Sequence, residues 1–387
     1  MIKIKTLNQI STIIYNYLPQ DKYLISPDVE NPDAILVRSA SCHDLTFNDN
    51  LLAIARAGVG VNNIPIPECT RRGIAVFNTP GANANAVKEL VLTAMFFVSR
   101  NIIPAMEWVQ TLKGKGDEVS ELVERGKRQF VGPELKGKKL GVVGLGSIGV
   151  MVANDATTLG MEVMGYDPFI SVESAWGLSS SVTRALNLEA LVSQCDYISI
   201  HVPLIEKTRD LFNAEIFKRI KQGSFLLNFS RDNIVNTRDV IEALDGGRLA
   251  YYITDFPVDE LLGHPKIIAI PHLGASTPES EENCASMAAQ QLRLFFESGD
   301  IRNSVNLPNC ELMTTSEFRL CVLHKNIPQM VSKFASILGE SNINIGDMIN
   351  KSAGELAYSL FALDDPLCID GVNRIKNIDG VLRVRSM

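Results

Sequence analysis

The chain has 387 residues, 46% of them hydrophobic and 21% charged, and its formal net charge is −7 at pH 7. These values describe a globular protein of two or three domains, and the acidic balance argues against a nucleic-acid partner, because phosphate neutralisation requires a basic surface. There is no apolar core of signal-peptide length after Met1 and no run of about 18 apolar residues, so we expect a cytoplasmic protein with no membrane partner. The seven cysteines are scattered without a C-x-x-C pair, which predicts reduced thiols and no metal site.

Short apolar runs separated by helix-like segments open the chain and predict the parallel strands of a small α/β unit: Tyr23–Ser26, Ala34–Val37, Leu51–Ala55 and Ala75–Phe77. Turn-rich loops, Arg56–Asn63 and Asn78–Asn85, follow two of these strands. Ligands of open parallel sheets bind beyond the carboxyl ends of the strands, so we expect these loops to contact a ligand. The alternative is that they are only turns.

A largely apolar segment, Ala86–Met106, predicts a long helix that breaks near Pro104 and carries the chain into a second unit. The polar segment after it contains Lys113, Lys115, Arg125, Lys127 and Arg128. We expect most of these charges to be solvated, with Lys127 or Arg128 reaching a phosphate as the alternative.

The most informative stretch is Leu140–Gly149, in which an apolar run breaks into glycines spaced G-x-G-x-x-G. Gly144 permits a tight strand-to-helix turn, Gly146 lets the backbone approach a pyrophosphate, and Gly149 lets the helix pack against the sheet. Asp167 ends the next apolar run, where it would accept hydrogen bonds from a ribose 2′-OH and repel a 2′-phosphate. The order of these parts predicts a dinucleotide site that prefers NAD.

Each of the strand-like runs that follow ends in a polar residue: Asp196–His201, Ser224–Arg231, Leu249–Asp255 and Lys266–His272. Helical segments at Asn213–Lys221 and Thr237–Gly246 separate some of these runs. This alternation predicts a doubly wound sheet whose polar strand ends meet at one edge.

Three of the polar residues suit hydride-transfer chemistry. His272 is the best candidate for the acid/base, because the Gly274 and Ala275 that follow it leave room for a ligand. Glu260 would orient this imidazole and favour its protonated form, with Asp259 as the rival. Arg231 offers a planar fork for a substrate carboxylate and could polarise a carbonyl.

A helix at Pro278–Ser298 and an aperiodic linker at Ile301–Ser316 come next, and then a separate small unit begins. Its predicted order is βαββαβ: Arg319–Leu323, Gln329–Leu338, Asn344–Ile349, Glu355–Leu363, Asp370–Asn377 and Val381–Val384.

The motifs Asn228–Arg231, Asp255–Glu260 and Pro271–Thr277, together with the glycine turn, resemble the D-2-hydroxyacid dehydrogenases over nearly the whole chain. The resemblance implies an α/β protein with a flavodoxin-like substrate domain at 1–94 and 278–305, and a Rossmann-type NAD domain at 95–277. A linker at 306–316 and a C-terminal α+β, ferredoxin-like domain at 317–387 would complete the chain. The tail resembles an ACT regulatory domain.

By this resemblance His272 is the acid/base, Glu260 its partner and Arg231 the carboxylate anchor. The segments Val37–Ser39, Arg56–Asn63 and Gly81–Ala86 resemble relatives that oxidise 3-phospho-D-glycerate to 3-phosphohydroxypyruvate with NAD, the entry to serine synthesis. Arg38 and Ser39 would hold the phosphate, and the backbone N–H groups of Val59 and Gly60 would contact the substrate. Further cofactor contacts would come from Ser147, Ile148, Val202, Phe229, Ser230, Asp255, Gly274 and Ala275.

The resemblance also implies a homodimer or homotetramer, and an L-serine effector at His324, Asn326 and Asn344. The C-terminal domain could instead serve only to join subunits. Alternative functions are reduction of another 2-oxo acid, such as hydroxypyruvate or glyoxylate, and a non-enzymatic NAD-sensing interaction protein.

Three positions depart from the family pattern. Asp232 follows the arginine where glycine is commonest, and Gln329 replaces the usual glycine of the effector turn. Glu260 and His272 are only twelve positions apart, which fits a shortened loop because both motifs are intact.

Overall fold

The computed structural model describes residues 1–387, and the chain forms two compact units. Unit 1 combines Met1–Asn83 with Pro278–Met387, and unit 2 is Ala84–Thr277. The first crossing lies about ten residues before residue 94, the position expected from the sequence, because the helix that begins at Ala84 packs within unit 2. None of the helices has the length and apolarity that a membrane crossing requires.

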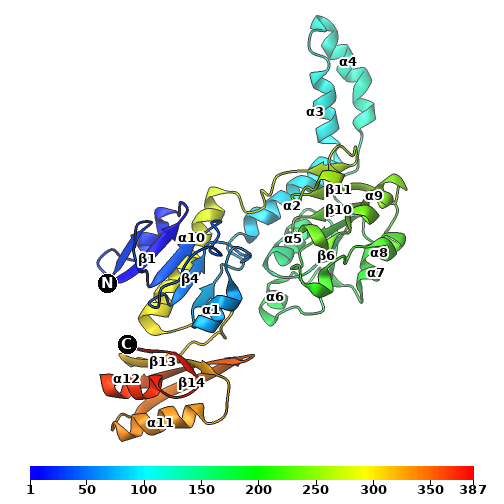
Figure 1. Ribbon diagram of the computed structural model, residues 1–387. Coiled ribbons are helices and arrows are strands. Elements are labelled where there is room, and N and C mark those ends of the chain that lie inside the picture. The colour runs from blue at the N-terminus through cyan, green and yellow to red at the C-terminus, as the bar shows by residue number, and fades with distance from the viewer. The chain divides into compact units, whose positions relative to one another are not determined.

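Unit 1 contains a parallel five-stranded sheet, which Figure 1 shows in blue. The strand order is β2-β1-β3-β4-β5, which is the flavodoxin-like order and confirms the predicted α/β fold. The strands are β1 (Ile2–Leu7), β2 (Tyr23–Ser26), β3 (Ala34–Val37), β4 (Ala53–Arg56) and β5 (Ala75–Phe77). Strand β1 was not predicted; its lysines alternate with partly or fully buried isoleucines.

Helices α1 (Ile66–Arg72) and α10 (Pro278–Ser298) complete this part of unit 1. The bounds of α10 match the prediction. The helix is 21 residues long and buries one stripe of small and apolar side chains, including Ala285, Ala288 and Leu292, in the core of the sheet. This stripe shows why a helix with many glutamates still packs firmly.

The C-terminal part of unit 1 has the predicted βαββαβ order, drawn in orange and red in Figure 1. Its antiparallel sheet has the order β14-β15-β13-β16. The elements are β13 (Phe318–Lys325), α11 (Met330–Glu340), β14 (Ile345–Ala353), β15 (Leu356–Leu363), α12 (Ile369–Lys376) and β16 (Val381–Ser386). One face of this sheet packs on Phe334 of α11, and the other joins the core around α10 through Leu323 and Tyr358.

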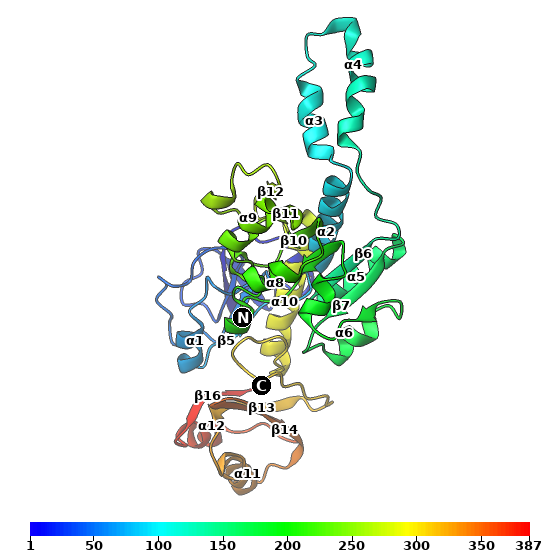
Figure 2. The ribbon, with the colours of Figure 1, turned by 90° about the vertical axis from the view of Figure 1, so that its right-hand side faces the viewer.

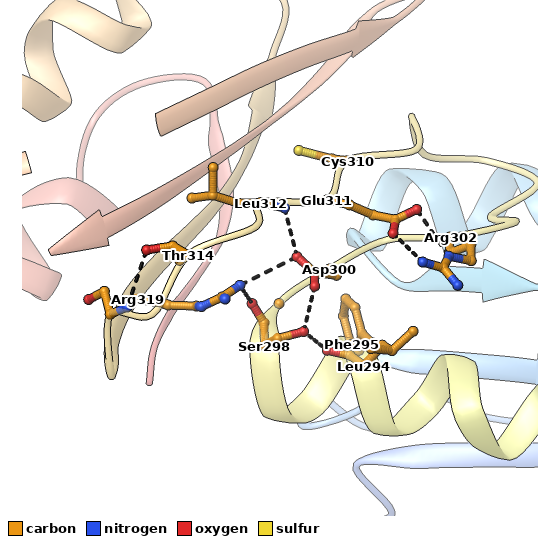
Figure 3. Close-up of polar contacts among 12 residues, drawn as sticks. Leu294, Phe295, Ser298, Asp300, Arg302, Cys310, Glu311, Leu312, Thr314 and Arg319 are labelled. Carbon is orange, nitrogen blue, oxygen red and sulfur yellow. Dashed lines mark hydrogen bonds and ion pairs between the residues drawn. The ribbon is translucent and has the colours of Figure 1, made fainter. Parts of the chain in front are cut away.

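The predicted linker is held by hydrogen bonds and an ion pair within unit 1 (Figure 3). Asp300, just after α10, accepts hydrogen bonds from Ser298 Oγ at 2.8 Å and from the Leu312 backbone N–H at 3.1 Å, and it pairs with Arg319 Nη1 at 3.4 Å. The Asp300 and Arg319 side chains are only 14% and 12% exposed. Ile301 pairs with Cys310 in an isolated β-bridge. The linker therefore lacks periodicity but is packed and hydrogen-bonded.

Unit 2 contains a parallel seven-stranded sheet of order β12-β11-β10-β9-β6-β7-β8, the Rossmann arrangement expected from the sequence. The strands are β6 (Lys139–Val143), β7 (Glu162–Tyr166), β8 (Thr183–Arg184), β9 (Tyr197–Ile200), β10 (Ser224–Asn228), β11 (Leu249–Thr254) and β12 (Ile267–Ala269). Two cores cover the sheet. One core contains helices α2 (Ala84–Ser99) and α5 (Ser147–Thr158). The other contains α7 (Leu188–Val192), α8 (Ala214–Arg219) and α9 (Thr237–Asp245). Helix α6 (Val172–Gly177) contacts α5.

The helix break predicted near Pro104 lies a few residues before the proline, at Arg100 and Asn101. The first helix, α2, ends at Ser99, and Asn101 has a φ of 48°, which the next helix, α3 (Ile102–Gln110), follows. Asn tolerates this left-handed conformation, and Pro104 lies in the first turn of α3, where a missing N–H breaks no helical hydrogen bond.

Helices α3 and α4 (Val119–Gly126) form a hairpin that stands away from the seven-stranded sheet of the same unit in both views (Figures 1 and 2). The Trp108 ring contacts that of Phe130 at 5.4 Å between centroids. Lys127, one candidate for a phosphate contact, instead forms an ion pair with Glu124 on the hairpin.

Candidate active site

The turn between β6 and α5 has the surroundings that a pyrophosphate requires. Gly144 has a φ of 93°, and a Cβ atom there would lie 2.7 Å from the carbonyl oxygen of His201. A Cβ on Gly149 would lie 2.0 Å from the Gly144 oxygen, whereas one on Gly146 would meet no atom within 4 Å. Helix α5 starts at Ser147 without a side-chain cap. The open space beside Gly146 therefore lies where the first N–H groups of a helix favour an anion.

Asp167 follows β7 and is held against this turn. Its Oδ2 accepts the Leu145 backbone N–H at 2.8 Å, and its Oδ1 accepts that of Phe169 at 2.8 Å. Each carboxylate oxygen has a further lone pair, so Asp167 can also accept a ribose hydroxyl.

The turn after β10 is ordered by Asn228. Its Nδ2 donates to the Arg231 carbonyl at 2.7 Å, and its Oδ1 accepts the Ser230 N–H at 3.2 Å. Ser230 Oγ donates to the Ile200 carbonyl of neighbouring β9 at 2.9 Å. These bonds fix Phe229, Ser230 and Arg231 directly beyond the strand, and Arg231 Nη1 donates to the Ser230 carbonyl at 2.6 Å.

Asp255 lies directly beyond β11 and is the buried carboxylate of this edge. Its Oδ2 accepts the Gly274 N–H at 3.2 Å, while its buried Oδ1 has no hydrogen-bond partner. Burial raises the pKa of Asp255, and the charges of His272 and Arg231 act in the opposite direction. A buried acceptor without a donor suits a ligand that brings a donor.

His272 is exposed, with its ring 4.6 Å from that of Phe256. Glu260 lies in a short 3-10 turn, Asp259–Leu261, and is also exposed. Glu260 and His272 form no hydrogen bond or ion pair with each other, and the charge of His272 acts on the carboxyl group of Asp255. Their pairing stays a prediction.

His201 follows β9, and Val202 lies directly after it. The Nε2 atom of His201 contacts Ser199 Oγ at 2.8 Å, and the Nδ1 atom of the same ring is buried without a hydrogen-bond partner. Burial lowers the pKa of His201 to about 3, so the ring is neutral at neutral pH.

The predicted substrate residues of unit 1 lie on two loops joined by Arg56. Arg56 Nε donates to the Arg38 carbonyl at 2.9 Å, and its Nη1 donates to the Gly60 carbonyl. The Ser39 N–H donates to Asn8 Oδ1 at 3.1 Å, and the Val59 carbonyl accepts from Asn78 Nδ2 at 2.7 Å. Arg56 was not predicted as a site residue, although its place at a strand end before two glycines was a signal in the sequence.

Arg38 itself is paired. Its Nη2 lies 2.6 Å from Oε1 of Glu281, in the first turn of α10. No sequence signal linked two residues so far apart in the chain, and the fold of unit 1 brings them together.

The three predicted effector residues have internal partners. The ring nitrogens of His324 contact Ser359 Oγ at 2.9 Å and the Lys325 carbonyl at 2.8 Å, and burial lowers the pKa of His324. Asn326 donates to the Gly354 carbonyl at 3.2 Å, and Asn344 to Asp364 Oδ2 at 2.9 Å. Gln329 has a φ of 68° directly before α11, a conformation that favours glycine.

No group of three or more His, Cys, Asp or Glu side chains is arranged to hold a metal ion. Six of the seven cysteines are buried, and all seven are free thiols.

Residues 92–274 match the family described as D-isomer specific 2-hydroxyacid dehydrogenase, NAD binding domain. D-3-phosphoglycerate dehydrogenase of Bacillus subtilis is 35% identical over 80% of this chain and 57% of its own length. The enzyme of the same name from Haemophilus influenzae is 30% identical over 87% of this chain and 81% of its own length.

The fold is similar to a crystal structure of NAD⁺-bound 3-phosphoglycerate dehydrogenase from Entamoeba histolytica, over 79% of this chain and 98% of the E. histolytica chain. Its TM-score is 0.61 at 26% identity. The chain spans only 57% and 49% of the relatives from B. subtilis and Synechocystis, about half their length. The chain belongs to the D-isomer specific 2-hydroxyacid dehydrogenase family.

Proposed function

We propose that this protein oxidises 3-phospho-D-glycerate to 3-phosphohydroxypyruvate with NAD, the first step of phosphorylated serine synthesis. The observation that carries the proposal is the edge of the seven-stranded sheet, where Arg231, Asp255 and His272 follow neighbouring strands of a glycine-turn domain. The names of the relatives support the substrate, and a cytoplasmic location belongs to the same proposal.

The residues present fit the cofactor. The Gly144–Gly149 turn and the start of α5, at Ser147 and Ile148, would hold the pyrophosphate, and Asp167 the ribose. The unpartnered Asp255 Oδ1 would accept an amide N–H. Val202, Phe229, Ser230, Gly274 and Ala275 would line the remaining contacts. Bound NAD would accept the hydride that leaves C2 of the substrate.

The side chains supply the rest of the reaction. Arg231 binds the substrate carboxylate and stabilises the carbonyl oxygen that develops at C2. The neutral imidazole of His272 takes the hydroxyl proton, and Asp255 or Glu260 stabilises the resulting imidazolium. Arg38 and Ser39 hold the phosphate, while the N–H groups of Val59 and Gly60 contact the substrate.

The test is an NADH-linked assay with 3-phosphoglycerate and a panel of other 2-hydroxy acids. His272→Ala should lower kcat by roughly 10²- to 10⁴-fold with a smaller change in KM. His264→Ala is the matched control, because that histidine is not among the proposed site residues and contacts Asp245 at the end of α9. Retained turnover in His272→Ala would remove it as the base, and equal use of NADP would contradict the role of Asp167.

Self-association is part of the proposal. Exposed apolar side chains gather on α2, α3 and the segment after α4, including Phe96, Met106 (62% exposed) and Val131 (78% exposed). Such a surface favours burial against a second copy, giving a homodimer or homotetramer. Sedimentation velocity of wild type and Met106→Glu tests this, and an unchanged sedimentation coefficient would contradict it.

The C-terminal βαββαβ part would act as an ACT-type regulatory domain that binds L-serine. Since His324, Asn326 and Asn344 have internal partners, serine must replace one or more of these hydrogen bonds. Calorimetric titration of the whole protein with L-serine, compared with Asn344→Ala, tests this role. A heat signal that Asn344→Ala does not weaken would contradict the assignment of that residue.

A further inference from the structure

The first turn of α10 places one carboxylate directly on the arginine that we assign to the substrate phosphate. Glu281 Oε1 lies 2.6 Å from Arg38 Nη2, and the two side chains are 44% and 38% exposed. Glu279, in the same turn, and Glu282, the next residue along the helix, make no ion pair with Arg38.

The surroundings of this pair contain a second cation. Arg56 donates to the Arg38 carbonyl, so the two guanidinium-bearing residues are joined through the backbone. One turn after Glu281, burial raises the pKa of the Cys284 thiol, and the charges of Arg38 and Arg56 both lower it. Arg38, the partner of Glu281, therefore lies near a second positive charge, that of Arg56.

We propose that Glu281 is a specificity-determining residue that competes with the substrate phosphate for Arg38; this inference rests on the proposed function. A phosphate monoester carries about −1.5 to −2 charges at pH 7, with a second pKa near 6. To bind Arg38, the phosphate must either displace the Glu281 carboxylate, which breaks the ion pair, or lie beside it, where like charges repel. An unphosphorylated 2-hydroxy acid brings no group to Arg38 and meets no such penalty.

Glu281 therefore sets the preference between phosphorylated and unphosphorylated substrates. With Glu281 ionised, the advantage that Arg38 gives the phosphorylated acid is reduced. Removing only the charge restores that advantage, since the amide oxygen of a glutamine still accepts from Arg38.

The test compares KM and kcat for 3-phosphoglycerate and D-glycerate in wild type, Glu281→Gln and the matched control Glu282→Gln. Glu281→Gln should lower KM for 3-phosphoglycerate about three- to tenfold, leaving kcat and the KM for D-glycerate unchanged. Glu282→Gln removes the same charge one residue away and should leave both KM values unchanged. Glu281→Ala serves as a second variant.

The pH dependence separates charge competition from a change in shape. Near pH 5.5 more of the substrate phosphate carries a single negative charge, so the KM ratio of wild type to Glu281→Gln should be smaller than at pH 8. A ratio that is the same at both pH values would overturn the competition.

Arg38→Ala distinguishes failure of the inference from failure of the proposed function. If Arg38→Ala raises KM for 3-phosphoglycerate and Glu281→Gln does not lower it, this inference is wrong and the substrate assignment stands. A raised KM in Glu281→Gln would show that Glu281 orients Arg38 for the phosphate, which also overturns competition. If Arg38→Ala leaves KM unchanged, the phosphate does not bind there, and both proposals fall.

Discussion

The two parallel sheets of this protein present loops at the carboxyl ends of their strands, but the polar groups there differ in their partners. In unit 2, Asp255 Oδ1 and His201 Nδ1 are buried without hydrogen bonds, and the space beside Gly146 is open. In unit 1, Asn63 Oδ1 is also buried without a hydrogen bond, but both arginines have partners: Arg38 pairs with Glu281, and Arg56 donates to two backbone carbonyls.

This difference teaches how each half of the comparison, the binding residues proposed in unit 2 and those proposed in unit 1, gains affinity for a ligand. Buried groups without partners gain hydrogen bonds from a ligand at little cost, so affinity in unit 2 depends on whether the ligand has room to reach them. A paired guanidinium must exchange one anion for another, so affinity in unit 1 depends on charge. The following changes test each half in turn.

The largest effect is expected at the glycine turn. Gly149→Ala places a Cβ atom 2.0 Å from the Gly144 oxygen. We expect the free energy of unfolding to fall by about 1–3 kcal/mol and NADH binding to weaken. Gly146→Ala should leave Tm nearly unchanged but also weaken NADH binding, because its methyl group enters only open space. Thermal melts and NADH fluorescence titrations measure both. Equal Tm values for the two variants would contradict the role of space.

Arg56→Met tests the paired half. The change removes two hydrogen bonds that join the Arg38 and Gly60 loops, so we expect KM for the substrate to rise about tenfold, the equivalent of one lost hydrogen bond to a charged group. The value of kcat should change much less, because Arg56 acts through these loops. Arg56→Lys, which retains the charge, should recover only part of the affinity if geometry matters. Full recovery would show that the charge alone suffices.

Asp255→Asn tests the buried acceptor. The variant retains an oxygen for the Gly274 N–H and replaces the free acceptor with an amide, so NADH binding should weaken about fivefold, roughly one net hydrogen bond. Since burial raises the pKa of Asp255, wild type should also lose stability as pH rises above the unfolded value of about 3.9, and the variant should not. Melts at pH 4 to 7 check the sign.

The smallest effect is expected from His201. Its pKa is lowered to about 3, so its contribution to stability is complete above the unfolded value of about 6.5 and decreases as pH falls towards 3. At pH 6 about 0.8 kcal/mol of this contribution has been lost. His201→Gln should flatten the dependence of Tm on pH between 6.5 and 5. An unchanged slope would place the acid sensitivity in other groups.

Local patterns were sufficient for much of the fold. The bounds of β2, β3, β5 and α10 match their predicted ranges, and the βαββαβ order of the C-terminal part is as expected. Apolar runs between turn residues and the periodicity of a helix are local signals, so they are visible in one sequence. The break at Asn101 was predicted a few residues too late because a left-handed asparagine leaves a weaker trace than proline.

The candidate site divides in the same way. The glycine spacing, Asp167 and the polar residues after β9 to β12 could be identified in order along the chain. The pairing of Glu260 with His272 stays a prediction, whereas the proximity of Asp255 to the charge of His272 became visible only in the fold. Arg56 lay within a recognised loop, but its acceptors are carbonyls, which every residue carries.

The sequence by itself determined the order of strands and helices, the dinucleotide turn and the set of residues available for chemistry, because these depend on neighbours along the chain. Only the tertiary structure decided that Glu281 forms an ion pair with Arg38 and that Asp300 and Arg319 anchor the linker after α10. Such contacts join segments whose separation in sequence carries no periodic signal. They form because a helix packed across a sheet brings its first turn to Arg38, far earlier in the chain, and its end to Arg319 of a strand that follows it.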